Sequence, residues 1–490
     1  MAWARLAGAG WVLIREGALL PIEYAELYPA PMRLAARVLQ AAAVPRGRPG
    51  ERLARALERL GPVAIKLGQL LSTRADILGA PFADDLARLK DRLDPFPLGV
   101  ARTEVARALG RPVDEVFTEF GPAVAAASLA QAHRATLADG RAVAVKVLRP
   151  GIETRVARDA KALALAAYLA QRLVPASRRL EPEAFAATVI RTTQLELDLR
   201  MEAAAADELR QVMATDGQMA APAVIWEAVA RRVMTLEWAQ GWPLSDPASL
   251  DQPGVDRPAL ATGLVRGFLS QALDHGLFHA DLHEGNLFVA APARITAVDF
   301  GIVGRLGPGE RRYLAEILLG FLRKDYVRVA QVHFEAGYVS SDQNVGEFAQ
   351  ALRAVGEQVF GRPADQISMG RVLTQLFEIT ALFGMRLRPE LVLLQKTMVT
   401  VEGVARRIDP QHDIWAAADP VVRRWMTREL APPAQVRRFA EEARSALRTI
   451  ARLAEAPPSV IVEPAQPKLL YFALGALATL AALVLGLVVG

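Results

Sequence analysis

The sequence of 490 residues predicts an α+β protein of two lobes with a cleft between them, followed by a C-terminal transmembrane helix. Three observations lead to this prediction. Strand-like segments cluster in residues 99–240, helical periodicity dominates residues 241–415, and Leu469 to Gly490 contain no charged side chain. The absence of cysteine excludes disulfides and thiolate metal sites.

The first 98 residues are predicted to be helical. Residues 1–50 are expected to form an amphipathic helical segment rather than a signal peptide, because arginine interrupts the apolar run twice. Residues 51–98 form a second helical segment, which ends in a proline-rich linker. In this segment Lys66 and Gln69 lie three residues apart and therefore share one face of the helix.

Residues 99–240 are expected to form a small sheet with an inserted helix. Strands are predicted at Val116 to Phe120, Ala132 to Leu137, Ala142 to Leu148, Ala223 to Trp226 and Arg232 to Trp238. The insertion runs from Ile152 to Arg210. Lys146 lies on the third strand, where an ammonium group can reach the phosphates of a nucleotide. Before it, the loop "AAASLAQAH" has alanine where a phosphate-covering loop usually has glycine.

Residues 241–415 are predicted to be mainly helical, with short strands at Asn286 to Val289 and Ile295 to Asp299. The stretch "HADLHEGNLFV", which begins at His279, allows three interpretations. His279, Asp281 and His283 have the spacing of a metallohydrolase site, although the other histidines offer no matching pair. A polar loop that satisfies helix ends is the second interpretation. The third is the catalytic loop of a phosphotransferase.

The spacing favours the third interpretation. Asp281 and Asn286 are five positions apart, and "VDFG", which contains Asp299, follows thirteen residues after Asn286. Either motif alone is a weak signal, whereas both in this order after a small sheet are a strong one. Helix resumes soon after Gly301 and no Ala-Pro-Glu follows at a suitable distance. The segment that docks a protein substrate in protein kinases is therefore missing.

At this point the sequence resembles the UbiB family of atypical kinases, over the range from Gly61 to Pro410. The segments that carry the resemblance, in order, are "KLGQ", "AAASLAQAH", "VAVKVLRPG", "ELDLRMEA", "HADLHEGN", "VDFG" and "VEGVARRIDP". The resemblance implies a protein-kinase-like fold with an N-terminal helical extension. The chain departs from the family pattern at Leu282 and Glu284, which replace catalytic-loop prolines, and at Ala130 and Ala132 of the Ala-rich loop.

The resemblance also implies roles for individual residues. Asp281 matches the catalytic aspartate, and Asn286 and Asp299 match the Mg²⁺ ligands. The nucleotide-binding residues are Lys146, its helix partner Glu202, the loop residues Ala125, Ala126, Ala127 and Ser128, and the strand-end residues Glu237 and Trp238. Lys66 and Gln69 belong to a lid over the cleft, which meets Glu196 and Asp198 of the ExD motif.

The function implied by the resemblance is a Mg²⁺-dependent kinase or ATPase that binds ATP or ADP and supports ubiquinone (coenzyme Q) biosynthesis. Its expected partners are membrane lipids, quinone precursors and other ubiquinone-biosynthesis proteins, rather than a phosphorylated protein or a nucleic acid. Two alternatives stay open. One is a nucleotide-gated lipid-binding scaffold without turnover, and the other is a metallohydrolase that uses His279, Asp281 and His283.

The C-terminal region predicts a membrane anchor. Residues 416–468 are expected to form Arg-rich helices next to the membrane, and residues 469–490 form the single span. A 22-residue helix is about 33 Å long, which suffices to cross a hydrocarbon core of about 30 Å. We expect a tail anchor in the bacterial inner membrane with the kinase-like body in the cytoplasm. The Gly486 and Gly490 pair is compatible with a homodimer.

Overall fold

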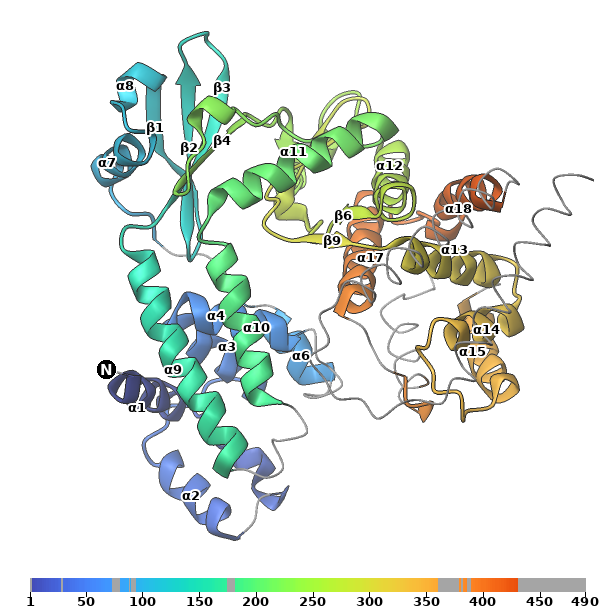
Figure 1. Ribbon diagram of the computed structural model, residues 1–490, viewed down its shortest axis with the longest axis horizontal. Helices are drawn as coiled ribbons and strands as arrows, with labels where there is room; N and C mark the ends of the chain where they lie inside the picture. The colour runs from blue at the N-terminus through green and yellow to red at the C-terminus, as the bar shows by residue number, and fades with distance from the viewer. Residues whose placement is uncertain are drawn as a thin grey trace, which may run out of the picture. The chain divides into compact units, whose positions relative to one another are not determined.

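An antiparallel sheet in the order β1-β2-β3-β4 organises the N-terminal lobe of the computed structural model (Figure 1). Its strands are β1 (Phe117–Ala126), β2 (Ala130–Leu137), β3 (Ala142–Leu148) and β4 (Val233–Glu237). The structure describes residues 2–27, 30–72, 80–87, 89, 94–173, 181–359, 379, 382–385 and 389–430.

The two faces of β3 have different neighbours because successive side chains alternate along a strand. Val143, Val145 and Val147 are buried in an apolar cluster with residues of α7 (Leu98–Leu109) and α8 (Val113–Val116). Lys146 lies between two of these valines and therefore points to the opposite face, toward the cleft. The alternation of β3 thus fixes both the core of this lobe and the direction of Lys146.

Three helices follow β3, where the sequence predicted one insertion. They are α9 (Ile152–Leu173), α10 (Pro182–Leu195) and α11 (Leu199–Asp216). The single-helix prediction is wrong at Glu196 to Asp198, because Asp198 caps α11 by accepting a hydrogen bond from the backbone N–H of Arg200. The chain therefore leaves α10 after Leu195 and begins α11 at Leu199.

The N-terminal helices pack against this insertion (Figure 1). They are α1 (Ala2–Arg15), η1 (Ile22–Leu27), α2 (Ala30–Gln40), α3 (Pro49–Leu60), α4 (Pro62–Ser72) and α6 (Ala80–Ala87). Among them, α4 lies against α3 and α6 and also against α9 and α10 of the insertion. The predicted helical extension is therefore placed beside the ExD motif, which follows α10 directly.

Two strand predictions differ from the structure. Ala223 to Trp226 is not a strand: only Val224 forms an isolated bridge, with Leu236, before the 3-10 turn η3 (Trp226–Ala228). The preceding Pro222 lacks an N–H group to extend a ladder. In contrast, β1 is longer than predicted and continues through Ala126, which pairs with Gln131.

The C-terminal lobe is mainly helical and carries short strand pairs around the cleft. Its helices are α12 (Arg257–Ser270), α13 (Pro308–Leu322), α14 (Tyr326–Glu335), α15 (Val345–Val359), α17 (Pro389–Ile408) and α18 (Ile414–Leu430), with the turns η4 (Pro247–Asp251), η5 (Gln271–His275) and η6 (Glu284–Asn286). The strands are β5 (Trp242–Pro243), β6 (Leu277–His279), β7 (Leu287–Ala290), β8 (Arg294–Ala297) and β9 (Val303–Arg305). The sequence predicted β7 and β8, but it missed β5 and the β6–β9 pair.

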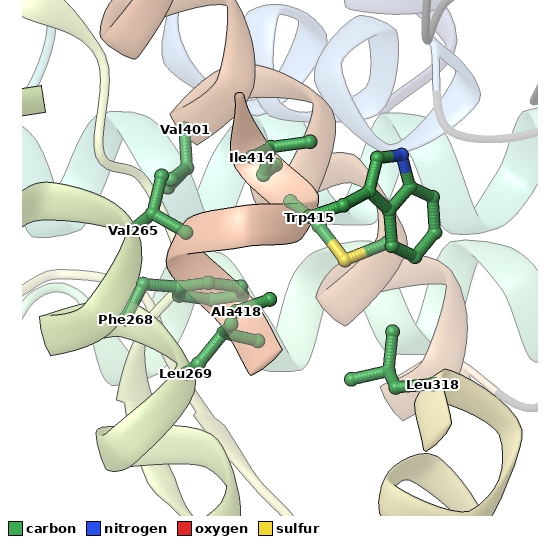
Figure 2. Close-up of a pocket in the computed structure, with 9 residues that line it drawn as sticks. Val265, Phe268, Leu269, Leu318, Val401, Ile414, Trp415 and Ala418 are labelled. Atoms are coloured by element: carbon green, nitrogen blue, oxygen red, sulfur yellow. The ribbon is translucent and has the colours of Figure 1, made fainter. Parts of the chain in front are cut away.

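The helices α12, α13, α17 and α18 enclose a small apolar cavity (Figure 2). Its lining consists of Val265, Phe268, Leu269, Leu318, Met398, Val401, Ile414, Trp415 and Ala418. The cavity has a volume of about 20 Å³, and all of its lining is apolar. It therefore offers no polar partner to a ligand, and it lies among the packed helices of the lobe.

The structure does not test the predicted membrane anchor. Residues 469–490, and the Arg-rich segment beyond Leu430, lie outside the described residues. Within the described part of the chain, no helix combines the length and the apolar character that crossing a bilayer requires. The tail anchor therefore stays a prediction.

A buried carboxylate on α17 should make stability depend on pH. Glu402 is 3% exposed and pairs with Arg406 at 2.9 Å. Burial raises its pKa to about 7 although Arg406 opposes the shift. The folded state therefore holds this proton more strongly than the unfolded state, and the free energy of unfolding should fall by about 1–3 kcal/mol between pH about 5 and 8.

Thermal unfolding of the Glu402→Gln variant between these pH values tests this expectation. Its stability should depend less on pH than that of the wild type, because glutamine does not titrate. Glu357→Gln is the matched control, since Glu357 is 46% exposed and pairs with Lys324 on the surface. An unchanged pH slope in Glu402→Gln would contradict the assignment of the slope to this carboxyl group.

Candidate active site

The cleft is organised around the ammonium group of Lys146. Its Nζ lies 2.6 Å from Oε1 of Glu202 and 3.1 Å from Oδ1 of Asp299. Lys146 comes from β3, Glu202 from the first turn of α11, and Asp299 from the loop between β8 and β9. Three segments that are far apart in sequence thus meet at one cation, in the combination predicted for phosphate positioning and metal binding.

The three groups shift one another's pKa values. Lys146 holds the pKa of Asp299 well below its usual range. Burial raises the pKa of Glu202 to about 7, and Asp299 adds to this shift while Lys146 opposes it. Burial alone would lower the pKa of Lys146, but the two carboxylates raise it above its ordinary value. At neutral pH the site therefore keeps a charged ammonium and an ionised Asp299.

The backbone of Asp299 is held in an uncommon conformation. Its φ is +64°, which places a residue other than glycine in the left-handed region. The next residue, Phe300, is 1% exposed, and its ring lies 5.3 Å from that of His279. Packing of Phe300 therefore fixes this turn, while the Asp299 side chain stays 51% exposed to the cleft. Such strain is maintained where the surrounding structure determines it, and it is common at functional sites.

The catalytic-loop residues hold one another by hydrogen bonds. Asn286 is buried, and its Nδ2 donates to the backbone carbonyl of Asp281 at 3.0 Å. Because the amide nitrogen is engaged there, Asn286 can offer its oxygen to a cation. Together with the carboxylate of Asp299 this is a set of hard oxygen donors, which is the set that Mg²⁺ prefers. The residues present therefore fit a magnesium ion.

His279 has a structural role that argues against the metallohydrolase alternative. Its Nδ1 accepts a hydrogen bond from the backbone N–H of Asp281 at 3.1 Å, and its Nε2 lies 3.1 Å from the carbonyl of Val298. The ring is fully buried, and both nitrogens are engaged. Over the described ranges, no three His, Asp or Glu side chains are grouped so that they could hold a metal.

The Ala-rich loop is shorter than the sequence suggested. Because Ala125 and Ala126 belong to β1, only residues 127–129 connect it to β2. Ala127 donates to the carbonyl of Ala130 at 2.8 Å and accepts from Nε of Arg149 at 2.9 Å. None of the residues from Ala125 to Ser128 has a positive φ. This loop conformation therefore does not require glycine, which explains how alanine can occupy it.

Two other residues of the same motif, Gln131 and His133, lie on the face of β2 opposite to that of Ala132, the residue paired with Lys146. The side chain of Gln131 bonds both backbone groups of Phe96, at 2.8 and 3.1 Å. The buried His133 ring lies 2.9 Å from the carbonyl of Gly121. Gln131 thus holds the linker at Phe96, and His133 holds the irregular part of β1 at Gly121. Both residues of the motif therefore stabilise the N-terminal lobe.

The predicted residues at the end of β4 have their own partners. Glu237 pairs with Arg141 at 3.3 Å, and the ring of Trp238 is covered by the Arg134 guanidinium at 5.0 Å. The backbone N–H of Trp238 donates to Ala142 at 2.9 Å. It is therefore not available to a base, and a nucleotide role for Glu237 and Trp238 stays a prediction.

The predicted lid residues divide into two groups. Lys66 Nζ lies 2.5 Å from Oε1 of Glu196, and the two side chains are only 14% and 19% exposed. Gln69 is half-buried on the same helix, α4. Asp198 does not share this contact, because it caps α11 and pairs with Arg200 at 2.6 Å. The ExD motif therefore contains one carboxylate that pairs with Lys66 and one that caps a helix.

Sequence reasoning missed two residues of α17 that contact the catalytic loop. Thr397 Oγ1 donates to the carbonyl of Ala280 at 3.1 Å. Arg407 forms an ion pair with Glu284. The segment "VEGVARRIDP" contains Arg407, but nothing in its composition indicates a partner more than a hundred residues earlier.

Comparison with known proteins accounts for this arrangement. Residues 88–333 match the ABC1 atypical kinase-like domain, and residues 352–413 match the UbiB helical domain. The chain belongs to the UbiB family. A relative from Marinobacter nauticus, described as a probable protein kinase UbiB, is 42% identical over 388 residues, which cover 78% of this chain and 71% of the relative.

A second relative of the same description, from Xylella fastidiosa, is 41% identical over 390 residues with the same two coverages. The structure of Rv3197 in complex with erythromycin, from Mycobacterium tuberculosis, has a TM-score of 0.52 at 24% identity and covers 80% of this chain and 98% of its own. The similarity to Rv3197 is a similarity of fold. The kinase-like fold with N-terminal helices, predicted from the UbiB resemblance, is confirmed.

The Lys66–Glu196 pair should be more strongly coupled than a surface pair. Removing either side chain leaves the other charge partly desolvated, so each single alanine variant should be destabilised and the double variant should show less than the sum. We expect a coupling energy above about 1 kcal/mol, with changed nucleotide affinity and a fold that survives. Chemical unfolding and nucleotide titration of Lys66→Ala, Glu196→Ala and the double variant measure it.

The Lys324–Glu357 pair is the matched control for this cycle. It joins the same two residue types at 3.1 Å, but its side chains are 48% and 46% exposed. Its coupling energy should lie between about 0 and 1 kcal/mol. Strictly additive effects at Lys66 and Glu196 would show that the two residues do not meet in solution.

Proposed function

We propose that this member of the UbiB family is a Mg²⁺-dependent atypical kinase or ATPase that supports ubiquinone biosynthesis at the bacterial inner membrane. The observation that carries the proposal is the convergence of Lys146, Glu202 and Asp299 beside the loop that contains Asp281 and Asn286. Each of these residue types is suited to one task in phosphoryl transfer.

Each residue of the cleft has a separate role in this proposal. Lys146 binds phosphate oxygens, and Glu202 fixes the position of its ammonium group. Asp299 and Asn286 hold Mg²⁺, which neutralises the charge of the phosphates when it is bound. Asp281 accepts a hydrogen bond from the attacking water or hydroxyl group and orients it. ATP or ADP is the nucleotide, since the cluster binds the phosphates that both share.

The nature of the acceptor follows from what surrounds the cleft. The helix α13 begins at Pro308, soon after Gly301, which leaves little chain to dock a protein substrate. The Lys66–Glu196 contact joins α4 to the end of α10. The UbiB resemblance implies that these residues form a lid, which would limit access further. Water or a small lipid acceptor therefore suits the site better than a protein. Isoprenoid quinone precursors are the proposed lipids, with other ubiquinone-biosynthesis proteins as partners.

An aspartate variant tests the nucleotide and metal site. Asp299→Asn should abolish Mg²⁺-dependent nucleotide binding, because an amide replaces the charged ligand. Stabilisation of the protein by Mg-nucleotide in thermal unfolding is the measurement. Asp419→Asn on α18, which removes a carboxylate paired with Arg423 at 2.6 Å, is the control and should bind normally. If Asp299→Asn is stabilised as much as the wild type, the kinase-like assignment of this cleft is wrong.

Turnover separates the proposal from the scaffold alternative. The wild type should release inorganic phosphate from Mg-ATP, and membranes or quinone-precursor analogues should change the rate. Nucleotide binding without phosphate release under all these conditions would favour a nucleotide-gated lipid-binding scaffold.

Membrane attachment is tested by truncation. A chain that lacks residues 469–490 should move to the soluble fraction, or stay attached only through its Arg-rich segment and be released by salt. Sedimentation of membranes in low and high salt measures this. If the truncated chain resists high salt, another apolar surface holds it. The exposed Trp3 and Trp11 of α1 are the first residues to examine in that case.

A further inference from the structure

We propose that Arg407 is a positioning residue, which neutralises Glu284 and so preserves the affinity of the cleft for an anionic Mg-nucleotide. The inference rests on the proposed nucleotide site. It concerns the contact between the catalytic loop and α17, and assigns a role to a residue outside the kinase-like domain.

Glu284 lies where a negative charge is unfavourable. It begins the 3-10 turn that ends at Asn286, and it stands three residues after Asp281. Asp281 and Asp299 already place two carboxylates at this side of the cleft. A complex of Mg²⁺ with ATP or ADP has a net negative charge, so a further unpaired carboxylate in the loop that contains Asp281 and Asn286 opposes its binding.

Arg407 neutralises the negative charge of Glu284. It lies in the last turn of α17, and its guanidinium pairs with the Glu284 carboxylate. The two side chains are 38% and 31% exposed, so solvent screens the pair only in part. The adjacent Arg406 forms an ion pair with a different carboxylate, that of the buried Glu402. Two neighbouring arginines thus point to two different acids, one in the core and one in the catalytic loop.

A second contact fixes the position of α17 against the same loop. Thr397 Oγ1 donates to the carbonyl of Ala280, which directly precedes Asp281. The residue is 1% exposed, so this hydrogen bond is made in the core. Thr397 and Arg407 are ten residues apart on one helix and contact the loop on either side of Asp281. The helix therefore contacts the loop at two points, which fixes the position of Arg407 relative to Glu284.

The test is a charge-neutralisation cycle on the full-length protein with Mg-ADP as the probe. Arg407→Gln should raise the dissociation constant by about ten-fold, equivalent to about 1.4 kcal/mol. Glu284→Gln should bind as tightly as the wild type or several-fold more tightly. The double variant should return to wild-type affinity, because neither charge remains. The loss in Arg407→Gln should also shrink as salt concentration rises.

A turnover measurement adds a readout that a merely structural role would not reproduce. If the wild type hydrolyses Mg-ATP, Arg407→Gln should raise KM with a smaller change in kcat, since the charge opposes binding rather than the chemical step. Arg423→Gln is the matched control. It removes an arginine from an ion pair with Asp419 on α18 and should leave nucleotide affinity unchanged.

The outcomes separate this inference from the proposed function. No binding of Mg-ADP by the wild type would overturn the nucleotide site itself. Wild-type affinity in Arg407→Gln, or no recovery in the double variant, would overturn the role of Arg407 alone. Should Arg407→Gln fail to fold, Glu284→Gln still decides, because weaker binding in that variant contradicts the proposal.

Discussion

The arrangement of the cleft depends on one ammonium group held between two carboxylates. Lys146 is directed toward the cleft because the valines on either side of it are buried in the core of the sheet. Glu202 and Asp299 then reach it from a helix and from a strained turn. Each carboxylate changes the pKa of the others, so the charge state of the site is a property of the group.

The rest of the catalytic loop is held by side-chain hydrogen bonds. His279 joins the loop to the carbonyl of Val298, and Asn286 joins its two ends. Thr397 adds a contact from α17, a helix of the UbiB helical domain. The same helix carries Arg407, which pairs with Glu284 of the loop. The helical domain is in this sense part of the site.

The residue types of the site and their order can be read from the sequence alone. The spacing of Asp281, Asn286 and Asp299, and the alternation around Lys146, depend on local periodicity and local chemistry, which a sequence displays directly. The sheet, the short strands β7 and β8 and the helical character of the C-terminal lobe were predictable for the same reason. The helical segment after Lys146 offered Glu196, Asp198 and Glu202 as candidate partners, and only the resemblance to a family assigned separate roles to them.

Which distant groups meet depends on the fold. Arg407 and Thr397 lie more than a hundred residues from the loop they contact, and no local pattern encodes such a contact. The same holds for the pairing of β6 with β9. It also holds for the different partners of Glu196 and Asp198, which are Lys66 and Arg200. Whether a charged side chain is solvated, caps a helix or completes a site depends on what the fold packs against it. The sequence shows the charge, and the fold supplies its partner.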